Sequence, residues 1–546
     1  MTSIPEATSQ YDAPVLIAGG GMVGLCAAAF LAQRGVASIA VERLKTSSPL
    51  PRAAFFHMRT MEMFRSLGIE DEVRERSSRE FVPEGAIVTL EAIAGRKLAD
   101  IMPTLNQGVE ALSPCRRLYL NQPSLEPILR ERAKAGGATI LQGAEMTGVR
   151  QDAEGVSMAV RNVDSGGERE LRGRYLIAAD GAHSKVRELL GIRYAGRGAF
   201  SNSVTIYFTA DLSRWIGDRA WSIIYVNNPA LRGFFRMNRA GTAGFLAVNI
   251  LGDPARDPEA AANVATDVSE ARLIELVRTG VGVPDLPVRI DGFTRWRASA
   301  CVAEIWREGR IFMAGDAAHL MPPNGGFGGN TGIHDAHNLA WKLAFVLGGH
   351  GPERLLETYA AERKPVAEFT VEQAFARYVD RTAPWLREAQ KPAPLVPDFD
   401  VELGYLYGSS LGVHADPKTI GGMPGSRAPH VWLSRHDTRI STIDLIGNYV
   451  VLSGPDGASW VRAAQSVAES TAVPIDAYCV GNDLADPGNS FCATYGISTK
   501  GAVLVRPDGF IAWRSRGEAT DTQGVIAAAL ARSLSNSTNS LTEHSA

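Results

Sequence analysis

The chain has 546 residues, of which 45% are hydrophobic and 21% are charged, and its formal net charge is -3 at pH 7. This length predicts two or three domains, and the composition is typical of globular proteins. The scattered basic residues exclude an electrostatic nucleic-acid site, and no apolar run is long enough for a membrane span. We therefore expect a globular protein with no nucleic-acid partner and no membrane span.

The cysteines indicate a reducing environment. They are odd in number, dispersed and without a CxxC pair: Cys26, Cys115, Cys301, Cys479 and Cys492. This pattern predicts neither structural disulfides nor a metal site. The start of the chain lacks the charged and apolar regions of a secretory leader. We expect a cytoplasmic protein.

A nucleotide-binding fingerprint follows the first apolar run. Residues 15–18 predict a buried strand, residues 19–24 read Gly-Gly-Gly-Met-Val-Gly, residues 22–35 are typical of a helix, and residues 38–42 predict a second strand. Gly19, Gly21 and Gly24 let the backbone turn tightly and approach a pyrophosphate at the helix N-terminus. Glu42 lies where a carboxylate can bind a ribose diol. The order strand, turn, helix, strand predicts a dinucleotide site.

The middle of the chain has a different pattern. Residues 199–250 alternate between polar and apolar positions and are rich in aromatic residues, which predicts an antiparallel sheet. Its aromatic face could line a substrate cavity or form ordinary core. Residues 310–316 then predict a buried strand that ends in Asp316, so the chain returns to the nucleotide-binding unit. Helices are expected over 332–347 and 352–387.

Two further motifs select the ligand of the fingerprint. Asp180-Gly181 follows one apolar run, and Gly315-Asp316 precedes the loop Pro322 to Asn330. Asp316 is placed to hold a ribityl chain or ribose, and the loop exposes N–H groups where a helix begins, a favourable position for a reduced, anionic flavin ring. Together with the fingerprint, these motifs predict FAD. A second fingerprint is absent, so a nicotinamide reductant would bind transiently, or the enzyme would be an oxidase.

These motifs together resemble the class A flavoprotein monooxygenases, the para-hydroxybenzoate-hydroxylase-like aromatic hydroxylases, and most of all the aromatic polyketide hydroxylases of the aklavinone 11-hydroxylase type. The similarity also includes Pro51-Arg52-Ala53-Ala54, Gln122 to Leu129 and Asp180 to Arg187. It covers nearly the whole chain, and it implies a C-terminal thioredoxin-like domain without redox cysteines.

The fold class implied is α/β, with a Rossmann-like FAD-binding domain, an inserted antiparallel-sheet substrate domain and the thioredoxin-like domain. The expected boundaries are 1–198 and 299–390 for the FAD-binding domain, 199–298 for the substrate domain, 391–430 for a linker, 431–532 for the thioredoxin-like domain and 533–546 for a disordered tail.

For the cofactor, the motifs and the resemblance nominate glycines and backbone of the fingerprint, residues at the adenosine end, residues near the ribityl chain and flavin, and the loop. They are Gly19, Gly21, Met22, Val23, Gly24, Glu42, Arg43, Arg52, Gln122, Met146, Asp180, Asp316, Pro323, Gly326, Gly328, Gly329 and Asn330. No metal ligands are nominated.

The resemblance implies a reaction in which NADPH reduces FAD, O₂ reacts with the reduced flavin, and a C4a-hydroperoxide hydroxylates a phenolic, polycyclic polyketide-type substrate. It nominates Tyr225 and Arg381 as catalytic, because a nearby guanidinium favours ionisation of a phenol. Tyr225 could instead be sheet core, and Arg381 a surface ion pair. Many relatives have Thr where this chain has Asn324, so contacts at the flavin ring are expected to differ, whereas His319 is expected to be structural.

Two other functions stay open on the sequence. The same fold hosts Baeyer–Villiger oxygenation of a ketone or quinone, and a non-catalytic flavin-binding protein would carry similar motifs. The small-molecule aromatic substrate is not identified, and the protein could be a monomer or a homo-oligomer.

Overall fold

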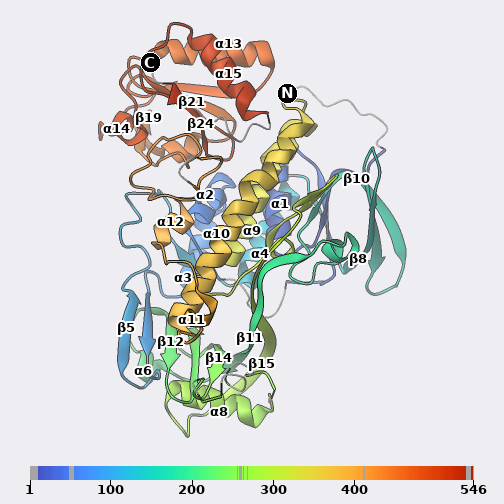
Figure 1. The fold of residues 1–546 in the computed structure, drawn as a ribbon, viewed down its shortest axis with the longest axis vertical. Coiled ribbons are helices and arrows are strands. Elements are labelled where there is room, and N and C mark those ends of the chain that lie inside the picture. Colours follow the sequence, from blue (N-terminus) through green and yellow to red (C-terminus); the bar gives the residue numbers. More distant parts are fainter. Residues whose placement is uncertain are drawn as a thin grey trace.

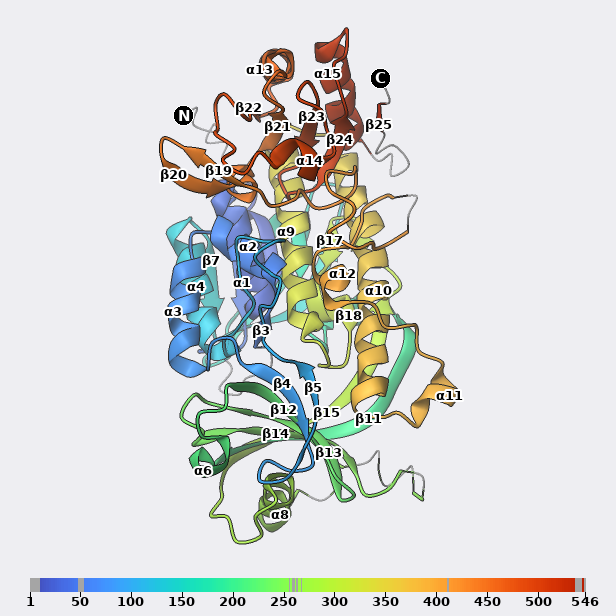
Figure 2. The same cartoon turned by 90° about the vertical axis from the view of Figure 1, so that its left-hand side faces the viewer.

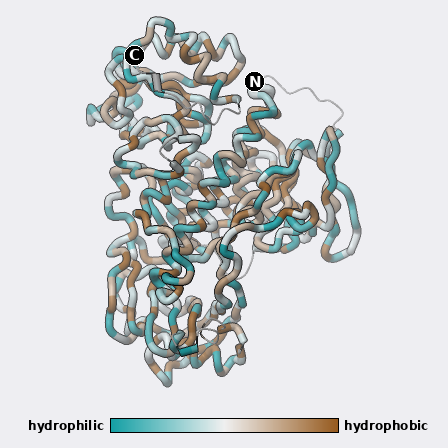
Figure 3. The backbone as a smooth tube through the Cα atoms, viewed as in Figure 1, coloured by the Kyte–Doolittle hydropathy of each residue, from teal (hydrophilic) through white to brown (hydrophobic). Residues whose placement is uncertain are grey.

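The computed structural model describes residues 10–47, 54–254, 256–257, 261, 264–266, 268–409, 412–535 and 543–544. Three sheet-containing units are stacked along the long axis: a C-terminal unit at one end, a first sheet with its helices in the middle, and a second sheet at the other end (Figures 1 and 2). Hydrophobic stretches concentrate along the central strands and helices, and hydrophilic stretches along the outer loops (Figure 3). No helix within the described ranges is long and apolar enough to cross a membrane.

The first sheet has a parallel centre. β1 (Ala13–Ala18) lies between β2 (Ser38–Glu42) and β10 (Glu168–Ala178), and β17 (Ile311–Met313) pairs in parallel with β10. The inner strands are buried on both faces, as is typical of parallel sheets covered by helices. The other strands of this sheet are β7 (Thr139–Gln142), β8 (Ala144–Gln151), β9 (Val156–Asn162) and β16 (Arg307–Glu308). This confirms the predicted Rossmann-like unit.

Long helices cover this sheet. α1 (Met22–Gln33) packs against α4 (Gln122–Ala135) and α9 (Phe327–Leu347), and α10 (Glu357–Arg381) crosses the molecule toward the second sheet (Figure 1). α9 begins at Phe327 rather than at residue 332, because Gly328 and Gly329 lie within its first turn instead of in the preceding loop. Gly332 is needed for close packing. A Cβ at Gly332 would lie 2.9 Å from the Cα of Gly315.

The second sheet includes strands from outside residues 199–298, the range expected for the substrate domain. Its order is β18-β15-β11-β14-β13-β12-β4-β5. The strands are β4 (Ala86–Leu90), β5 (Lys97–Met102), β11 (Tyr194–Thr209), β12 (Trp221–Asn227), β13 (Leu231–Met237), β14 (Ala243–Leu251), β15 (Arg289–Ala303) and β18 (His319–Leu320). The range 1–198 was therefore wrong for the FAD-binding domain alone: β4 pairs with β12 far along the chain, a contact that local patterns do not encode.

The C-terminal unit has a five-stranded sheet with the order β22-β21-β23-β24-β25, in which β25 is Glu543–His544. β21 (Tyr449–Ser453) is parallel to β22 (Ile475–Cys479) and antiparallel to β23 (Ala502–Val505), which turns back into β24 (Ile511–Ser515). Helices α13 (Ala458–Thr471) and α15 (Thr522–Ser533) pack together beside this sheet (Figure 2). The predicted α/β fold class is confirmed.

Two segments depart from the expected boundaries. Residues 391–430 are not a free linker, because they contain α12 (Asp398–Glu402) and the buried residues Tyr405 and Tyr407. In the predicted disordered tail, Glu543–His544 form β25 against β24. Apart from Ser533–Ser535, the rest of that tail lies outside the described residues.

Candidate active site

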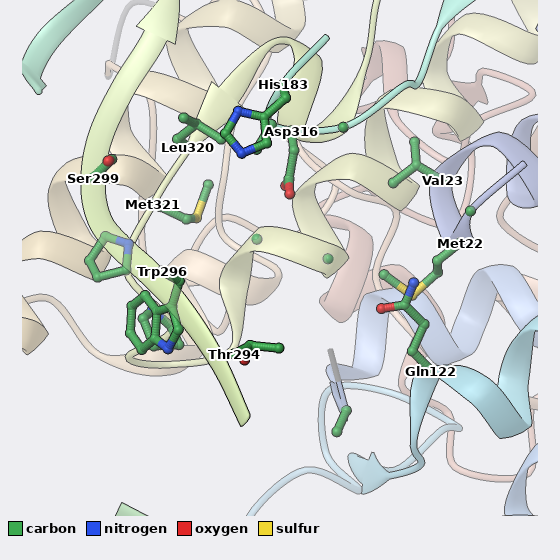
Figure 4. Close-up of a pocket in the computed structure, with 18 of the residues that line it drawn as sticks. Met22, Val23, Gln122, His183, Thr294, Trp296, Ser299, Asp316, Leu320 and Met321 are labelled. Atoms are coloured by element: carbon green, nitrogen blue, oxygen red, sulfur yellow. The ribbon is translucent and has the colours of Figure 1, made fainter. Parts of the chain in front are cut away.

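One large cavity, of about 1680 Å³, lies between the first and second sheets. Met22, Val23 and Gln122 lie on one side of it, and Thr294 and Trp296 lie on β15 across from them (Figure 4). The fingerprint turn, the Asp180-Gly181 motif and the loop 322–329 all line this cavity. The tertiary structure thus brings the three motifs together.

The glycine turn leaves room for a phosphate. Gly19 has a φ of +98°, and a Cβ there would lie 2.3 Å from the carbonyl oxygen of Ala179. A Cβ at Gly24 would lie 1.9 Å from the oxygen of Gly19, whereas at Gly21 the nearest atom would be 4.0 Å away. Gly21 is also the N-cap of α1 and provides no side-chain cap. The N-terminal N–H groups of α1 therefore suit a pyrophosphate.

The adenosine end is formed around Glu42. Its carboxylate accepts hydrogen bonds from the backbone N–H groups of Gly20 and Leu44, both at 2.9 Å. These bonds orient a carboxylate that still has free lone pairs for a diol. Arg43 and Met146 also line the cavity. Arg52 lies outside the described residues.

Two aspartates follow strands of the first sheet. Asp180 Oδ2 accepts the N–H of Val186, while its buried Oδ1 has no partner within the described residues. Asp316 is exposed between buried neighbours, and its side chain points into the cavity (Figure 4). An orphaned buried oxygen and an inward carboxylate fit the hydroxyl donors of FAD.

Gln122 begins α4 and lines the cavity, and its Nε2 donates to Glu126 Oε1 at 2.7 Å. Glu126, which the sequence did not nominate, also lines the cavity although it is only 3% exposed. Its carboxylate holds the Gln122 amide in place beside the fingerprint turn.

A buried network lies behind Asp316. Asp335 accepts hydrogen bonds from His319 Nε2 and Arg363 Nε, both at 2.8 Å, and from the N–H of Gly315 at 3.2 Å. Burial raises the pKa of Asp335, but Arg363 and His319 outweigh it and hold that pKa below its usual range. Through Asp335, His319 thus helps to support the turn at Gly315, which is the structural role expected for it.

The loop 322–330 presents Pro323, Gly326, Gly328 and Gly329 to the cavity, but not Asn330. The Asn330 side chain accepts from the His57 N–H and the Thr60 hydroxyl, and donates to the carbonyls of Phe55 and Gly326. The polar side-chain atoms of Asn330 therefore bind protein and position the loop, and its contact with the cofactor stays a prediction.

Tyr225 and Arg381 meet at the other end of the cavity. Arg381, at the end of α10, hydrogen-bonds to Tyr225 on β12. Burial lowers the pKa of Arg381, but Tyr225 and Asp398 outweigh it and raise that pKa overall. Asn324 Nδ2 lies 3.5 Å from the Tyr225 oxygen. The residue that departs from the family pattern therefore contacts the nominated catalytic tyrosine.

Several cavity residues carry no local sequence signal. α12 supplies Asp398 and Glu402 to the lining, and Arg117 Nε donates to both Glu402 oxygens at 3.0 and 2.9 Å. Tyr119 and Arg236 also line the cavity. Alternation in residues 199–250 could have placed Arg236 on the cavity face, but nothing could have placed α12.

Known proteins match this chain throughout. Residues 12–374 match the FAD binding domain family, and residues 421–537 match the family described as aromatic-ring hydroxylase, C-terminal. A 4-methyl-5-nitrocatechol 5-monooxygenase of Burkholderia sp is 46% identical over 97% of this chain and 99% of that protein. An aklavinone 12-hydroxylase of Streptomyces purpurascens is 38% identical, with coverages of 96% and 99%.

A solved structure agrees with these matches. The ternary complex of aklavinone-11 hydroxylase with FAD and aklavinone has a TM-score of 0.88 and 36% identity, and the alignment covers 96% of this chain and 99% of that one.

Proposed function

Because this chain belongs to the FAD-dependent aromatic-ring hydroxylases and is therefore a flavin monooxygenase, we propose that it uses NADPH and O₂ to hydroxylate a phenol. The proposal depends on one observation above all: the Tyr225 hydroxyl lies in the cavity with Arg381 and Asn324 beside it.

The fit of the cavity to FAD supports a proposal of which residues would hold the cofactor. The α1 N-terminus and Gly21 would hold the pyrophosphate, Glu42 the adenosine ribose, and Asp316 and Gln122 the ribityl region. The chemistry that FAD supplies when bound is transfer of electrons from NADPH to O₂, so that one oxygen atom goes to the substrate and the other to water.

Tyr225 would act on the substrate proton. Donors from Arg381 and Asn324 point at its oxygen and stabilise negative charge there. In its ionised form, Tyr225 can accept the proton of a phenol bound against this oxygen, which makes the ring more electron-rich at the attacked carbon. The apolar side chains of Ile87 and Phe234 line the same end and help to exclude water.

The substrate class has two candidates. Similarity to the aklavinone hydroxylases supports a polycyclic, polyketide-type phenol. The relative at 46% identity is named for a single-ring nitrocatechol, which makes such a catechol the second candidate.

NADPH oxidation by the purified yellow holoenzyme distinguishes them. The assay compares anthracyclinones, naphthols and nitrocatechols, with mass detection of a product that gains one oxygen. We expect substrate-stimulated NADPH oxidation coupled to a product with its ring intact. A ring-expanded lactone would instead support Baeyer–Villiger oxygenation, and NADH oxidation at the same rate would contradict the choice of donor.

A further inference from the structure

α12 brings two carboxylates to the wall of the cavity. The helix packs against the start of α9, where Val401 shares a buried cluster with Phe327. Asp398 and Glu402 lie one helical turn apart on the same face of α12, and both line the cavity. Both oxygens of Glu402 accept from Arg117, so protein satisfies this carboxylate.

The two oxygens of Asp398 are bound differently. Oδ1 accepts from Nε and Nη2 of Arg377, at 3.0 and 2.7 Å, whereas no donor among the described residues binds Oδ2. Arg377 does not belong to the described lining of the cavity, so the oxygen that remains for the cavity is Oδ2. Burial raises the pKa of Asp398, but Arg377 and Arg381 outweigh it and hold that pKa below its usual range. The side chain is therefore charged at neutral pH and keeps free lone pairs.

Asp398 lies at the end of the cavity that holds Tyr225. Arg381, which hydrogen-bonds to Tyr225, also interacts electrostatically with Asp398. Among the described ion pairs, however, Asp398 pairs with Arg377 and not with Arg381. A ligand can therefore reach Asp398 without displacing Arg381, and one aromatic molecule can contact both Tyr225 and Asp398.

The chemistry of the cavity indicates what Oδ2 would bind. Hydroxylation by a flavin monooxygenase needs a site from which water is excluded. An ionised oxygen that loses its water and gains no donor is costly, and a hydroxyl group of the substrate would remove that cost. An ammonium group fits less well, because the guanidinium groups of Arg377, Arg381 and Arg117 already act on Asp398.

We propose that Asp398 is a specificity-determining residue that accepts a hydrogen bond from a second hydroxyl of the substrate, while Tyr225 and Arg381 bind the hydroxyl that is activated. The inference rests on the proposed function and narrows its substrate to aromatic compounds with at least two hydroxyl groups. A compound whose second hydroxyl is replaced by a methyl ether offers Oδ2 no donor and is disfavoured.

Ligand binding to the holoenzyme tests this without turnover. Flavin absorbance is titrated, without NADPH, with phenol and with catechol, resorcinol and hydroquinone, which carry the second hydroxyl at different ring positions and are neutral at pH 7. The pair 1-naphthol and 1,5-dihydroxynaphthalene extends the comparison to two rings. We expect wild type to bind at least one diol about 10- to 100-fold more tightly than its single-hydroxyl counterpart, because hydrogen bonds to an ionised acceptor are strong. The monomethyl ether of that diol should bind no more tightly than the single-hydroxyl compound.

Asp398→Ala removes the acceptor. In D398A the diol should lose its advantage, while the affinities for the single-hydroxyl compound and for FAD stay close to wild type. Arg377 keeps acceptors in the Gln373 side chain and the Val396 carbonyl, so the variant is expected to fold. D398N keeps the size of the side chain but not its charge; it should show an intermediate ratio, and it decides the test if D398A fails to retain FAD.

Asp400→Ala is the matched control. Asp400 lies on the same helix, outside the described lining of the cavity and beside His414, and its substitution should keep the preference for the diol. Equal affinities for diol and single-hydroxyl compounds in wild type, or an unchanged ratio in D398A, would overturn the inference. An equal loss of affinity for all probes would do the same, because Asp398 would then act through Arg381 or through FAD. Absence of hydroxylation in an enzyme that keeps the preference would refute only the proposed function.

Discussion

The buried charges where the C-terminal unit meets the first unit are paired differently from the buried Arg236 in the cavity. Where the C-terminal unit meets the first unit, Glu362 accepts from Arg506 and Lys342, and Asp508 pairs with Arg506. Beside them, Glu62 pairs with Arg59 and Arg427. In the cavity, Arg236 has no such partner among the described residues.

The difference bears on what each charge contributes to stability. Paired buried charges cost little while both partners stay, but removal of one partner strands the other. At the interface the pairs join α2 (Met58–Ser66), α9 and α10 to the turn between β23 and β24. They give a structural reason for retaining a C-terminal unit that lacks a redox CxxC pair. Arg236 instead lines the cavity and forms no ion pair among the described residues.

The largest effect is expected at the catalytic end of the cavity. Tyr225→Phe should lower the rate of hydroxylation roughly 10²- to 10⁴-fold, because it removes a proton acceptor, while FAD binding and thermal stability stay close to wild type. Single-turnover product formation measures the loss. Tyr449→Phe removes a buried hydroxyl at the C-terminal unit instead and should leave the rate unchanged; wild-type turnover in Tyr225→Phe would refute the role.

Breaking an ion pair at the interface should instead lower the stability and leave the rate of hydroxylation close to wild type. Glu362→Gln leaves the buried Lys342 without a carboxylate and removes one of the two carboxylates that bind Arg506. It should lower the free energy of unfolding by about 3–5 kcal/mol, as measured by urea denaturation. Glu518→Gln, the same substitution in an exposed pair with Lys500, should cost less than about 1 kcal/mol. Equal losses of stability in the two variants would show that the buried ion pairs contribute no more to stability than the exposed pair does.

Substitution of Asn330 tests whether the loop 322–330 needs the hydrogen bonds made by this side chain. Asn330→Ala removes the four hydrogen bonds to the 55–60 segment and Gly326, and should cost about 1–3 kcal/mol of stability. FAD should also dissociate faster, because the loop that lines the cavity loosens. Flavin fluorescence measures the release, with exposed Asn482→Ala as the control. An unchanged release rate would limit Asn330 to a role in stability.

The smallest effect is the pH dependence of the interface. Arg427 and Arg59 outweigh burial and lower the pKa of Glu62 from 4.5 to about 2. Between these values the unfolded chain binds a proton that the folded protein excludes, so stability falls as the pH drops below about 4.5. For Glu62 alone the loss is roughly 0.8 kcal/mol between pH 7 and pH 4.

Urea unfolding at pH 7 and at pH 4 gives the slope of the free energy of unfolding against pH. It should be shallower in Glu62→Gln, whereas Arg236→Met should keep the wild-type slope because the cavity charge lacks an acidic partner. An unchanged slope in Glu62→Gln would mean that other carboxylates carry the acid sensitivity.

Local signals explain which predictions succeeded. The strand, glycine turn and helix of residues 13–33 are encoded within a few residues, since Gly19 needs a positive φ and Gly24 tolerates no Cβ. The same holds for the loop before α9, although its glycines hid the true start of the helix. Segments without such requirements were misassigned, such as β4 in the second sheet and α12 in the supposed linker.

The sequence by itself determined the α/β fold class and FAD as the cofactor, because close backbone approach to a phosphate demands glycine at fixed spacing. Only the tertiary structure decided that Asn324 contacts Tyr225, that Asn330 faces protein rather than the cavity, and that Arg236 is buried there without a carboxylate. These facts arise from pairings between distant strands and helices. Whether a side chain is buried, and which groups it contacts, depends on how the whole chain packs and cannot be read from the residue type alone.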